Sequence, residues 1–370
     1  MLDERGLVTW ERRSENAQVL MITNAWPHPD SPAYGPFVKR SCDALAQLGV
    51  PADVLFVRGY RGPQAYLAGA LVAAAIPLAH PGRYLLVHCH GGEVALVGRC
   101  FRGAPVLASY LGSDLLGGSI GGSRATRLKC SFRSLLVRRH AVLMTASTTK
   151  SAEMEGLLPR TARARNLVIP DGVERGRFTP GDRRSACLEL GWDPDAYNVL
   201  FAGRADAVEK RLWLARETVA VAAERLAGVE LKVASGLAPE QMPTLYRAAD
   251  CLLHTSASEG SSNVIKEALA CNLAVVATPS GDTAEQLSQI AACSVCPADA
   301  RVLATALLGV LASRARSDGR ARTAHLSVER SAERTLDCYQ ALAPAITCRR
   351  ERGRAATGKQ STAAMIRPAA

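Results

Sequence analysis

Long hydrophobic runs and aromatic side chains are both scarce in this sequence. The longest apolar run covers residues 66–79 and is interrupted by Pro77, whereas a helix that crosses a bilayer needs about 20 apolar residues. The first residues, MLDERGLVTWERR, lack the apolar segment of a secretory signal, so we expect a cytoplasmic protein. Aromatic residues make up only 5% of the chain. This scarcity argues against stacking on single-stranded nucleic acid, and no nucleic-acid partner is expected.

Paired cysteines and metal-binding clusters are also missing from the sequence pattern. The 11 cysteines are an odd number and most lie in apolar stretches, which is typical of reduced core residues. Cys293 and Cys296 form a single CxxC pair, although a structural zinc site needs four ligands. His88 and His90 have no nearby carboxylates and are interpreted as core or acceptor-pocket residues. We therefore expect neither a metal ion nor another cofactor.

Acidic residues are absent from one basic segment and nearly absent from another. The chain carries 45 Lys and Arg against 34 Asp and Glu, a net charge of +11. Residues 124–139 hold six basic residues and no acidic one, and residues 346–370 hold six basic residues against Glu351. Such clusters favour anionic partners such as phosphorylated molecules or anionic lipid. We expect a basic helix at 124–139, which is either a solvated face or a peripheral contact with the inner face of the plasma membrane.

Strand-like and helix-like segments alternate along the chain. Strands are expected at 17–23, 52–57 and 142–146, among others, and segment 66–79 is interpreted as a packed helix rather than a membrane dip. This alternation is typical of a parallel sheet covered by helices on both faces. It breaks at 166–180, a connection punctuated by Pro and Gly, and then restarts. The sequence therefore predicts two doubly wound, Rossmann-like α/β domains that face each other across a ligand-binding cleft.

Charged residues follow two expected strands of the second half. Arg204 comes directly after a strand at 198–202, and Lys210 follows one loop later; both charges suit a diphosphate that gains charge as it leaves. Glu259 lies in a small-residue loop before a helix that contains Glu267, and such a helix start can bind phosphate. On spacing alone, a capped helix start with solvated surface charges is favoured over a ligand site. Asp282 is interpreted as a helix cap.

An extended pattern around these residues carries a family resemblance. The segments VIPDGVERGRF (168–178), FAGR with EK (201–210) and residues 242–287 resemble family 4 retaining glycosyltransferases, which have the two-Rossmann GT-B fold. Segments 19–49 and 87–98 are similar to that family's first domain, and the likeness covers about residues 17–343. The expected domains are an acceptor-side domain at 1–175, a nucleotide-sugar-binding domain at 176–328, a helix at 329–343 that returns to the first domain, and a basic disordered tail at 344–370.

The resemblance implies an enzyme, a retaining hexosyltransferase. It would move a sugar from a nucleotide-diphosphate-sugar donor to a glycan or lipid-linked acceptor in cell-surface polysaccharide or glycolipid biosynthesis. Two alternatives stay open: a nucleotide-sugar epimerase on the same fold, and a non-catalytic nucleotide-sugar-binding subunit of a polysaccharide assembly complex.

The resemblance also implies roles for individual residues. Arg204 and Lys210 would hold the diphosphate, Glu267 the ribose and Glu259 the sugar hydroxyls. Backbone amides would approach the donor at Gly260, Ser261, Ser262 and Asn263, and Gly35 would let the backbone come near the β-phosphate or the acceptor. Asp114 is expected to be catalytic, although Leu111 replaces the histidine of the family's usual His-Gly-x-Asp. One additional residue also separates Arg204 from Lys210.

Overall fold

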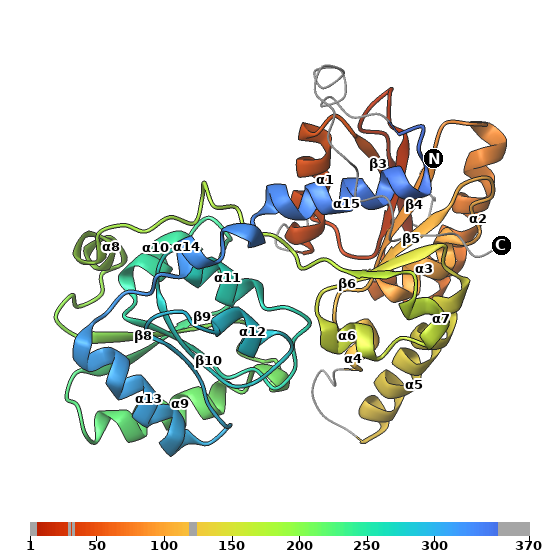
Figure 1. The fold of residues 1–370 in the computed structure, drawn as a ribbon. Coiled ribbons are helices and arrows are strands. Elements are labelled where there is room, and N and C mark those ends of the chain that lie inside the picture. Colours follow the sequence, from red (N-terminus) through yellow and green to blue (C-terminus); the bar gives the residue numbers. More distant parts are fainter. Residues whose placement is uncertain (1–5, 29–30, 32–33, 118–123, 347–370) are drawn as a thin grey trace. The chain divides into compact units, whose positions relative to one another are not determined.

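A computed structural model describes residues 6–28, 31, 34–117 and 124–346 of the protein (Figure 1). The chain divides into two compact units. The first unit comprises residues 1–117, 131–171 and 328–370, and the second comprises residues 118–130 and 172–327. Residues 347–370 of the expected tail lie outside the described residues, whereas Ile346 is buried in the core of the first unit.

The first unit is built on a seven-stranded sheet in the order β1-β3-β2-β4-β5-β6-β7. Neighbouring strands are parallel except β1, which pairs antiparallel with β3. The sequence pattern did not predict β1, because its segment lies among charged residues. The strands are β1 (Val8–Glu11), β2 (Val19–Thr23), β3 (Ala52–Val57), β4 (Leu86–His90), β5 (Val106–Ser109), β6 (Ala146–Thr149) and β7 (Asn166–Val168).

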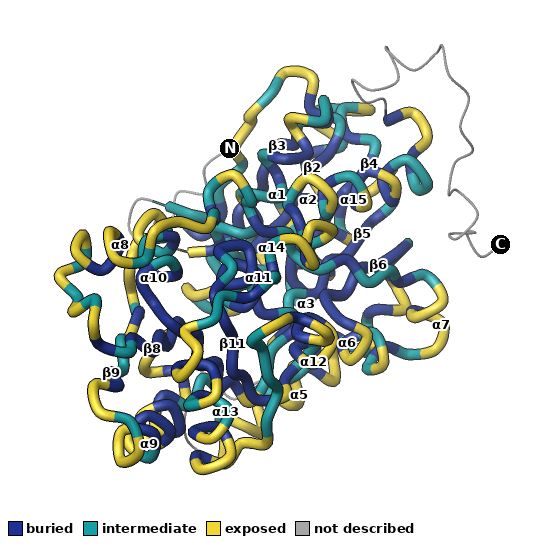
Figure 2. The backbone as a smooth tube through the Cα atoms, turned by 60° about the vertical axis from the view of Figure 1, so that its left-hand side comes forward, coloured by how far each residue is buried: buried dark blue, intermediate teal, exposed yellow. Residues whose placement is uncertain are grey.

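Helices cover both faces of this sheet. In β3, Val54 and Phe56 belong to one core cluster and Leu55 to the other, because successive side chains of a strand point to opposite faces. The cluster that contains Val54 and Phe56 also includes residues of α1 (Pro36–Gln47) and α15 (Val328–Leu342). β2, β3 and β4 are buried along their whole length (Figure 2). The other face is covered by α2 (Pro63–Ala79), α3 (Gly92–Gly98), α6 (Ala152–Gly156), α7 (Arg160–Arg163) and the part of α5 (Arg124–His140) from residue 131 onward, with α4 (Ser113–Leu116) beside α3.

Helix α2 is the longest apolar segment of the sequence, and one of its faces lies in the core. Ala65, Ala73 and Ile76 are buried, whereas Leu67 and Leu78 on the other side are exposed. The predicted packed helix is therefore confirmed. Among the helices that the structure describes, none is both long enough and apolar enough to cross a membrane.

The second unit contains a parallel sheet in the order β12-β11-β10-β8-β9. Its strands are β8 (Tyr197–Ala202), β9 (Val229–Ala234), β10 (Cys251–His254), β11 (Ala274–Ala277) and β12 (Cys293–Val295). Its helices are α8 (Arg183–Leu190), α9 (Leu212–Ala223), α10 (Met242–Ala248), α11 (Asn263–Ala270), α12 (Thr283–Leu287), α13 (Ala300–Ser313) and α14 (Gly319–Arg322). Core clusters on both faces of the sheet bury β8 and β10 completely except for Tyr197. The predicted class, two Rossmann-like α/β domains, is thereby confirmed.

Two predictions of individual elements are wrong. The strand expected at 142–146 is a short 3-10 helix (Ala141–Leu143) followed by β6. The apolar pattern misled here, because Val142 and Leu143 are exposed while the polar segment ASTT of β6 is buried in the sheet. The connection expected at 166–180 begins with β7, where the Asn166 side chain donates to Thr149 and accepts from Ser147.

A buried hydrogen-bonded chain ties α15 to the first sheet. The hydroxyl of Tyr339 lies 2.6 Å from Nδ1 of His88, and Nε2 of His88 lies 2.7 Å from Oγ of Ser109. Burial lowers the pKa of His88, so the neutral ring offers one donor and one acceptor to these two hydroxyls. His88 is therefore a core residue.

We expect Tyr339→Phe to destabilise the protein by about 1–3 kcal/mol, because it leaves a buried imidazole nitrogen without its partner. Chemical denaturation followed by circular dichroism measures the change in the free energy of unfolding. Tyr60→Phe is the matched control, since Tyr60 is exposed. Equal stability of the two variants would contradict a structural role for the His88–Tyr339 hydrogen bond.

Candidate functional site

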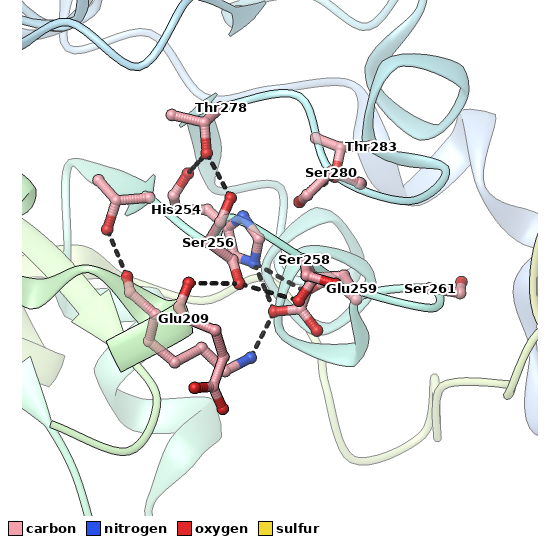
Figure 3. A network of polar contacts seen from close by, with 12 residues as sticks. Glu209, His254, Ser256, Ser258, Glu259, Ser261, Thr278, Ser280 and Thr283 are labelled. Atoms are coloured by element: carbon pink, nitrogen blue, oxygen red, sulfur yellow. Dashed lines mark hydrogen bonds and ion pairs between the residues drawn. The ribbon is translucent and has the colours of Figure 1, made fainter. Parts of the chain in front are cut away.

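The loops after β8 and β10 meet at the carboxyl ends of the second unit's strands (Figure 3). β8 has β9 on one side and β10 on the other, so the chain changes direction between β8 and β10, which is where open α/β sheets bind ligands. The loops are hydrogen bonded: Thr255 Oγ1 donates to the Lys210 carbonyl at 2.8 Å, and the Ala257 amide donates to the Glu209 carbonyl at 2.7 Å.

Arg211 joins three loops at this edge. Its guanidinium donates to the carbonyls of Thr255 (2.6 Å) and Ser256 (2.9 Å) and to the hydroxyl of Thr278 (3.0 Å), which follows β11. Arg211 itself has a φ of 51°, a left-handed conformation that starts α9. The sequence analysis missed this residue, since nothing local separates it from a solvated arginine.

Lys210, His254 and Glu259 form a largely buried polar cluster. Nζ of Lys210 forms an ion pair with Oε1 of Glu259, and Nε2 of His254 lies 3.4 Å from the same oxygen. Burial alone would raise the pKa of Glu259, but the contact with His254 and the charge of Lys210 lower the pKa to about 2. Glu259 is therefore an anion at neutral pH. Lys210 and Glu259, which the resemblance assigned to the diphosphate and the sugar, are in direct contact.

The N-terminus of α11 lies beside this cluster. Ser262 occupies the expected N-cap position, but its side chain makes no cap hydrogen bond. Its hydroxyl lies instead 3.1 Å from Nε2 of His254, so His254 diverts it from the helix amides. The first amides of a helix have no partner within the helix, and they form an anion-binding end. His254 escaped the sequence analysis because its contacts depend on the loop conformation.

A second set of contacts fixes the loop that carries Ser261. The Ser261 hydroxyl donates to Oδ2 of Asp282 at 2.7 Å, and Nε2 of Gln286 donates to both side chains. Asp282 is at the N-cap position of α12, as expected, but its side chain makes no cap hydrogen bond. Gly281 has a φ of 54°, and a Cβ there would lie 2.5 Å from the Glu259 carbonyl oxygen. Glycine is required for this close approach.

Two residues that the resemblance assigned to the nucleotide-sugar donor lie outside the cluster of Lys210, His254 and Glu259. Arg204 is exposed and forms a two-pronged ion pair with Asp206, with nitrogen–oxygen distances of 3.1 and 2.7 Å. Glu267 is buried in α11 and accepts a hydrogen bond of 3.0 Å from the Tyr246 hydroxyl. Exposed ion pairs contribute little stability, so Arg204 can exchange Asp206 for an anionic ligand at small cost. Asn263 is the first residue of α11, and Gly260 opens the segment that leads to it.

The predicted residues of the first unit stabilise turns. Asp114 is buried, and its carboxylate accepts from the backbone amides of Gly92 (2.9 Å), Gly112 (2.9 Å) and Leu115 (3.0 Å), as well as Leu111. These bonds hold the turn after β5 against the start of α3. Gly35 has a φ of 68°, and a Cβ there would lie 2.4 Å from the Ala25 carbonyl, so this glycine is needed for the protein's own backbone.

The described residues contain no group of three or more His, Cys, Asp or Glu side chains that could hold a metal ion. The ten described cysteines are all free. The positive groups that the sequence predicted for a ligand in the second unit are Lys210 and Arg204, together with the N-terminus of α11.

Comparison with known proteins gives a family match for part of the second unit. Residues 189–313 match the family model described as "Glycosyl transferases group 1", and this stretch includes Arg204, Lys210, Glu259 and Glu267. A D-inositol 3-phosphate glycosyltransferase of Actinosynnema mirum is 29% identical over 257 residues, covering 59% of this chain and 61% of that protein. The protein of the same name from Segniliparus rotundus is 32% identical over 209 residues, covering 47% and 46%. The chain thus spans about half of the length of these curated relatives.

Solved structures resemble the whole fold. Sucrose-phosphate synthase from Thermosynechococcus elongatus matches with a TM-score of 0.71 at 19% identity, over 89% of this chain and 100% of that one. Anabaena HepE, solved with UDP and glucose, matches with a TM-score of 0.64 at 15% identity, over 88% and 100%.

The fold is therefore GT-B, with two Rossmann-like domains in one chain. Within it, residues 189–313 carry the pattern of the group 1 glycosyltransferases, and the resemblance seen in the sequence is confirmed.

We expect the Glu259 carboxylate to stabilise the second unit in a pH-dependent way. Its pKa is lowered in the folded protein, so its contribution is complete above its ordinary pKa of 4.5 and is lost as the pH falls toward about 2. The loss amounts to at most on the order of 3 kcal/mol. Chemical denaturation of the wild type and of Glu259→Gln between these pH values measures the loss, as a difference in the slope of the free energy of unfolding against pH. Glu240→Gln is the control, because Glu240 is largely exposed; identical slopes for all three proteins would contradict the ion-pair assignment.

Proposed function

We propose that the protein is a retaining glycosyltransferase that moves a hexosyl group from a nucleotide-diphosphate-sugar donor to a glycan or lipid-linked acceptor. The observation that carries this proposal is the contact of Lys210 with Glu259 beside the start of α11. It lies at the switch point of the second sheet and inside the stretch that matches the glycosyltransferase family. The UDP bound to HepE and the ADP bound to a starch synthase of this fold support a nucleotide-sugar donor.

In the proposed complex, Lys210 and Arg204 bind the diphosphate, and the amides of Gly260 to Asn263 approach the phosphates and the sugar. Lys210 leaves part of its contact with Glu259 when the phosphate arrives, and Glu259 then accepts from sugar hydroxyls. Glu267, held by Tyr246, accepts from the ribose hydroxyls. Positive charge and amide dipoles placed at the phosphates stabilise the charge that develops there as the bond to the sugar breaks.

The acceptor hydroxyl attacks the anomeric carbon on the face from which the diphosphate leaves. The carbon–oxygen bond to the phosphate breaks as the bond to the acceptor oxygen forms, and the acceptor proton passes to the leaving phosphate oxygen. No covalent bond to the protein forms, and neither a metal ion nor another cofactor is needed in this proposal. Asp114, through its bonds to the Gly92 and Gly112 amides, is a positioning residue for the acceptor side.

The acceptor belongs to cell-surface polysaccharide or glycolipid biosynthesis in this proposal, at the inner face of the plasma membrane. The support is the basic character of α5, whose 17 residues include six cations and no carboxylate. An acceptor on an anionic leaflet places the enzyme at that surface.

We expect Arg204→Ala and Glu267→Ala to weaken donor binding by about 1.5–3 kcal/mol each, because each removes a charge-assisted hydrogen bond. Titration calorimetry with a panel of nucleoside diphosphates and their sugars measures the change. Arg216→Ala and Glu217→Ala on α9 are matched controls, since both residues are exposed.

For Glu259→Gln we expect the opposite change: the affinity for the nucleoside diphosphate without its sugar increases. The neutral amide releases Lys210 and removes a nearby negative charge, so diphosphate affinity rises while sugar transfer falls. A loss of diphosphate affinity in this variant, or unchanged affinity in all three, would place the phosphates elsewhere.

Product stereochemistry tests the reaction itself. We expect NMR to show the donor's anomeric configuration in the product, and turnover to persist in excess chelator, because Arg204 and Lys210 supply the charge for the leaving group. An inverted product, or activity abolished by chelation and restored by a divalent ion, would overturn this mechanism.

A further inference from the structure

Helix α5 exposes a row of large apolar side chains. Leu128 and Phe132 are 72% and 60% exposed, and Leu135 and Leu136 are 46% and 39% exposed. Their spacing of four, seven and eight residues places them on one side of the helix. Ser134 and Val137 on the other side are buried, and Val137 belongs to the core of the first unit. The outward side of α5 therefore carries four large apolar side chains, whereas the outward side of a helix on a soluble domain is usually polar.

Cations border this row. At about 100° per residue, Arg124, Lys129 and Arg139 fall within or beside it, and all three are exposed. Two further cations of the helix are used within the fold: Arg133 forms an ion pair of 3.1 Å with Glu93, and Arg138 donates to the Leu115 carbonyl at 2.9 Å. Four cations of α5 form no side-chain ion pair or hydrogen bond with any other residue that the structure describes: Arg124, Arg127, Lys129 and Arg139.

We propose that α5 is a membrane-docking helix whose apolar row inserts into the headgroup region of an anionic leaflet. Its cations then contact the lipid phosphates. Charge complementarity selects this occupant, because a helix with Leu and Phe on its outward face, bordered by Arg and Lys and without acids, is typical of segments that lie in a membrane interface. With 17 residues, α5 presents this face over about 25 Å.

The inference deepens the membrane association proposed above, and its biological purpose rests on the proposed function. Docking by α5 gives that association a stated mechanism: attraction by the cations, followed by burial of Leu128 and Phe132. Vesicle binding needs no sugar donor, so it can be measured independently of transfer.

The test uses the full chain and sedimentation with vesicles of phosphatidylglycerol and phosphatidylcholine in equal parts, or of phosphatidylcholine alone. We expect binding to the anionic vesicles only, weakened by salt as the Debye length falls. The double variant Leu128→Ser/Phe132→Ser binds at least about tenfold more weakly, because it loses apolar burial. Replacing Arg124, Arg127 and Lys129 by Gln weakens binding about fivefold per charge, the equivalent of about 1 kcal/mol each. Leu188→Ser on α8, where the leucine is 64% exposed, leaves binding unchanged.

Insertion has its own readout. In a Phe132→Trp variant, lipids brominated in the acyl chains quench more tryptophan emission than they quench in the wild type. Equal vesicle binding by the wild type and the Leu128→Ser/Phe132→Ser variant would overturn the proposal, and so would the absence of any binding to anionic vesicles. The second result would leave an acidic protein as the occupant of this face.

Two further measurements separate this proposal from the proposed function. Nucleoside diphosphate affinity is expected to be the same in the α5 variants and the wild type, and circular dichroism verifies their fold. Vesicle binding without any donor binding would leave the docking helix standing and overturn the donor site. Donor binding and transfer without vesicle binding would leave the donor site standing and overturn the docking helix.

Discussion

The geometry of the second unit's site depends on the hydrogen bonds that the guanidinium of Arg211 donates. It ties together segments that follow three different strands, through Thr255, Ser256 and Thr278. Arg211 begins α9 in a left-handed conformation, which is unfavourable for a residue with a Cβ. Burial lowers the pKa of Arg211, yet an arginine remains charged in a protein. The hydrogen bonds to these loops therefore stabilise both an unfavourable backbone angle and a partly buried charge.

Because Arg211 is fixed, Lys210 is fixed next to it. Its backbone carbonyl accepts from Thr255, so the side chain starts from a defined point and ends on Glu259. An ion pair in a partly buried position requires good geometry to offset the desolvation of both groups. His254 adds to this geometry by approaching the same carboxylate oxygen and by holding Ser262 away from the amides of α11. The result is a site in which the opposite charges of Lys210 and Glu259 are paired and the Ser262 side chain does not cap the amides of α11.

The sequence predicted the alternating elements and the chemistry-bearing residues better than it predicted their contacts. Buried strands such as β2 and β3 are apolar throughout and were recognisable, whereas β6 is polar in sequence and is held by its neighbours in the sheet. Lys210 and Glu259 were both singled out, but they are 49 residues apart and meet only because β8 and β10 are adjacent. Asp114 and Gly35 were noticed as parts of a pattern, although their visible contacts are with nearby backbone. Such contacts depend on turn geometry, which residue types alone do not specify.

The position of α15 in the sequence has a consequence for how the chain is made. Its residues complete one core cluster of the first unit together with α1 and β3, yet they follow the whole of the second unit in the chain. During synthesis, the second unit's long segment 172–327 is complete before α15 leaves the ribosome. At about 5–20 residues per second, the part of this core that α15 covers stays uncovered for roughly 10–30 s. The nascent chain therefore leaves the side of α1 that α15 covers, and the buried His88, exposed during that interval, and a chaperone that binds apolar surface has its main opportunity there rather than after release.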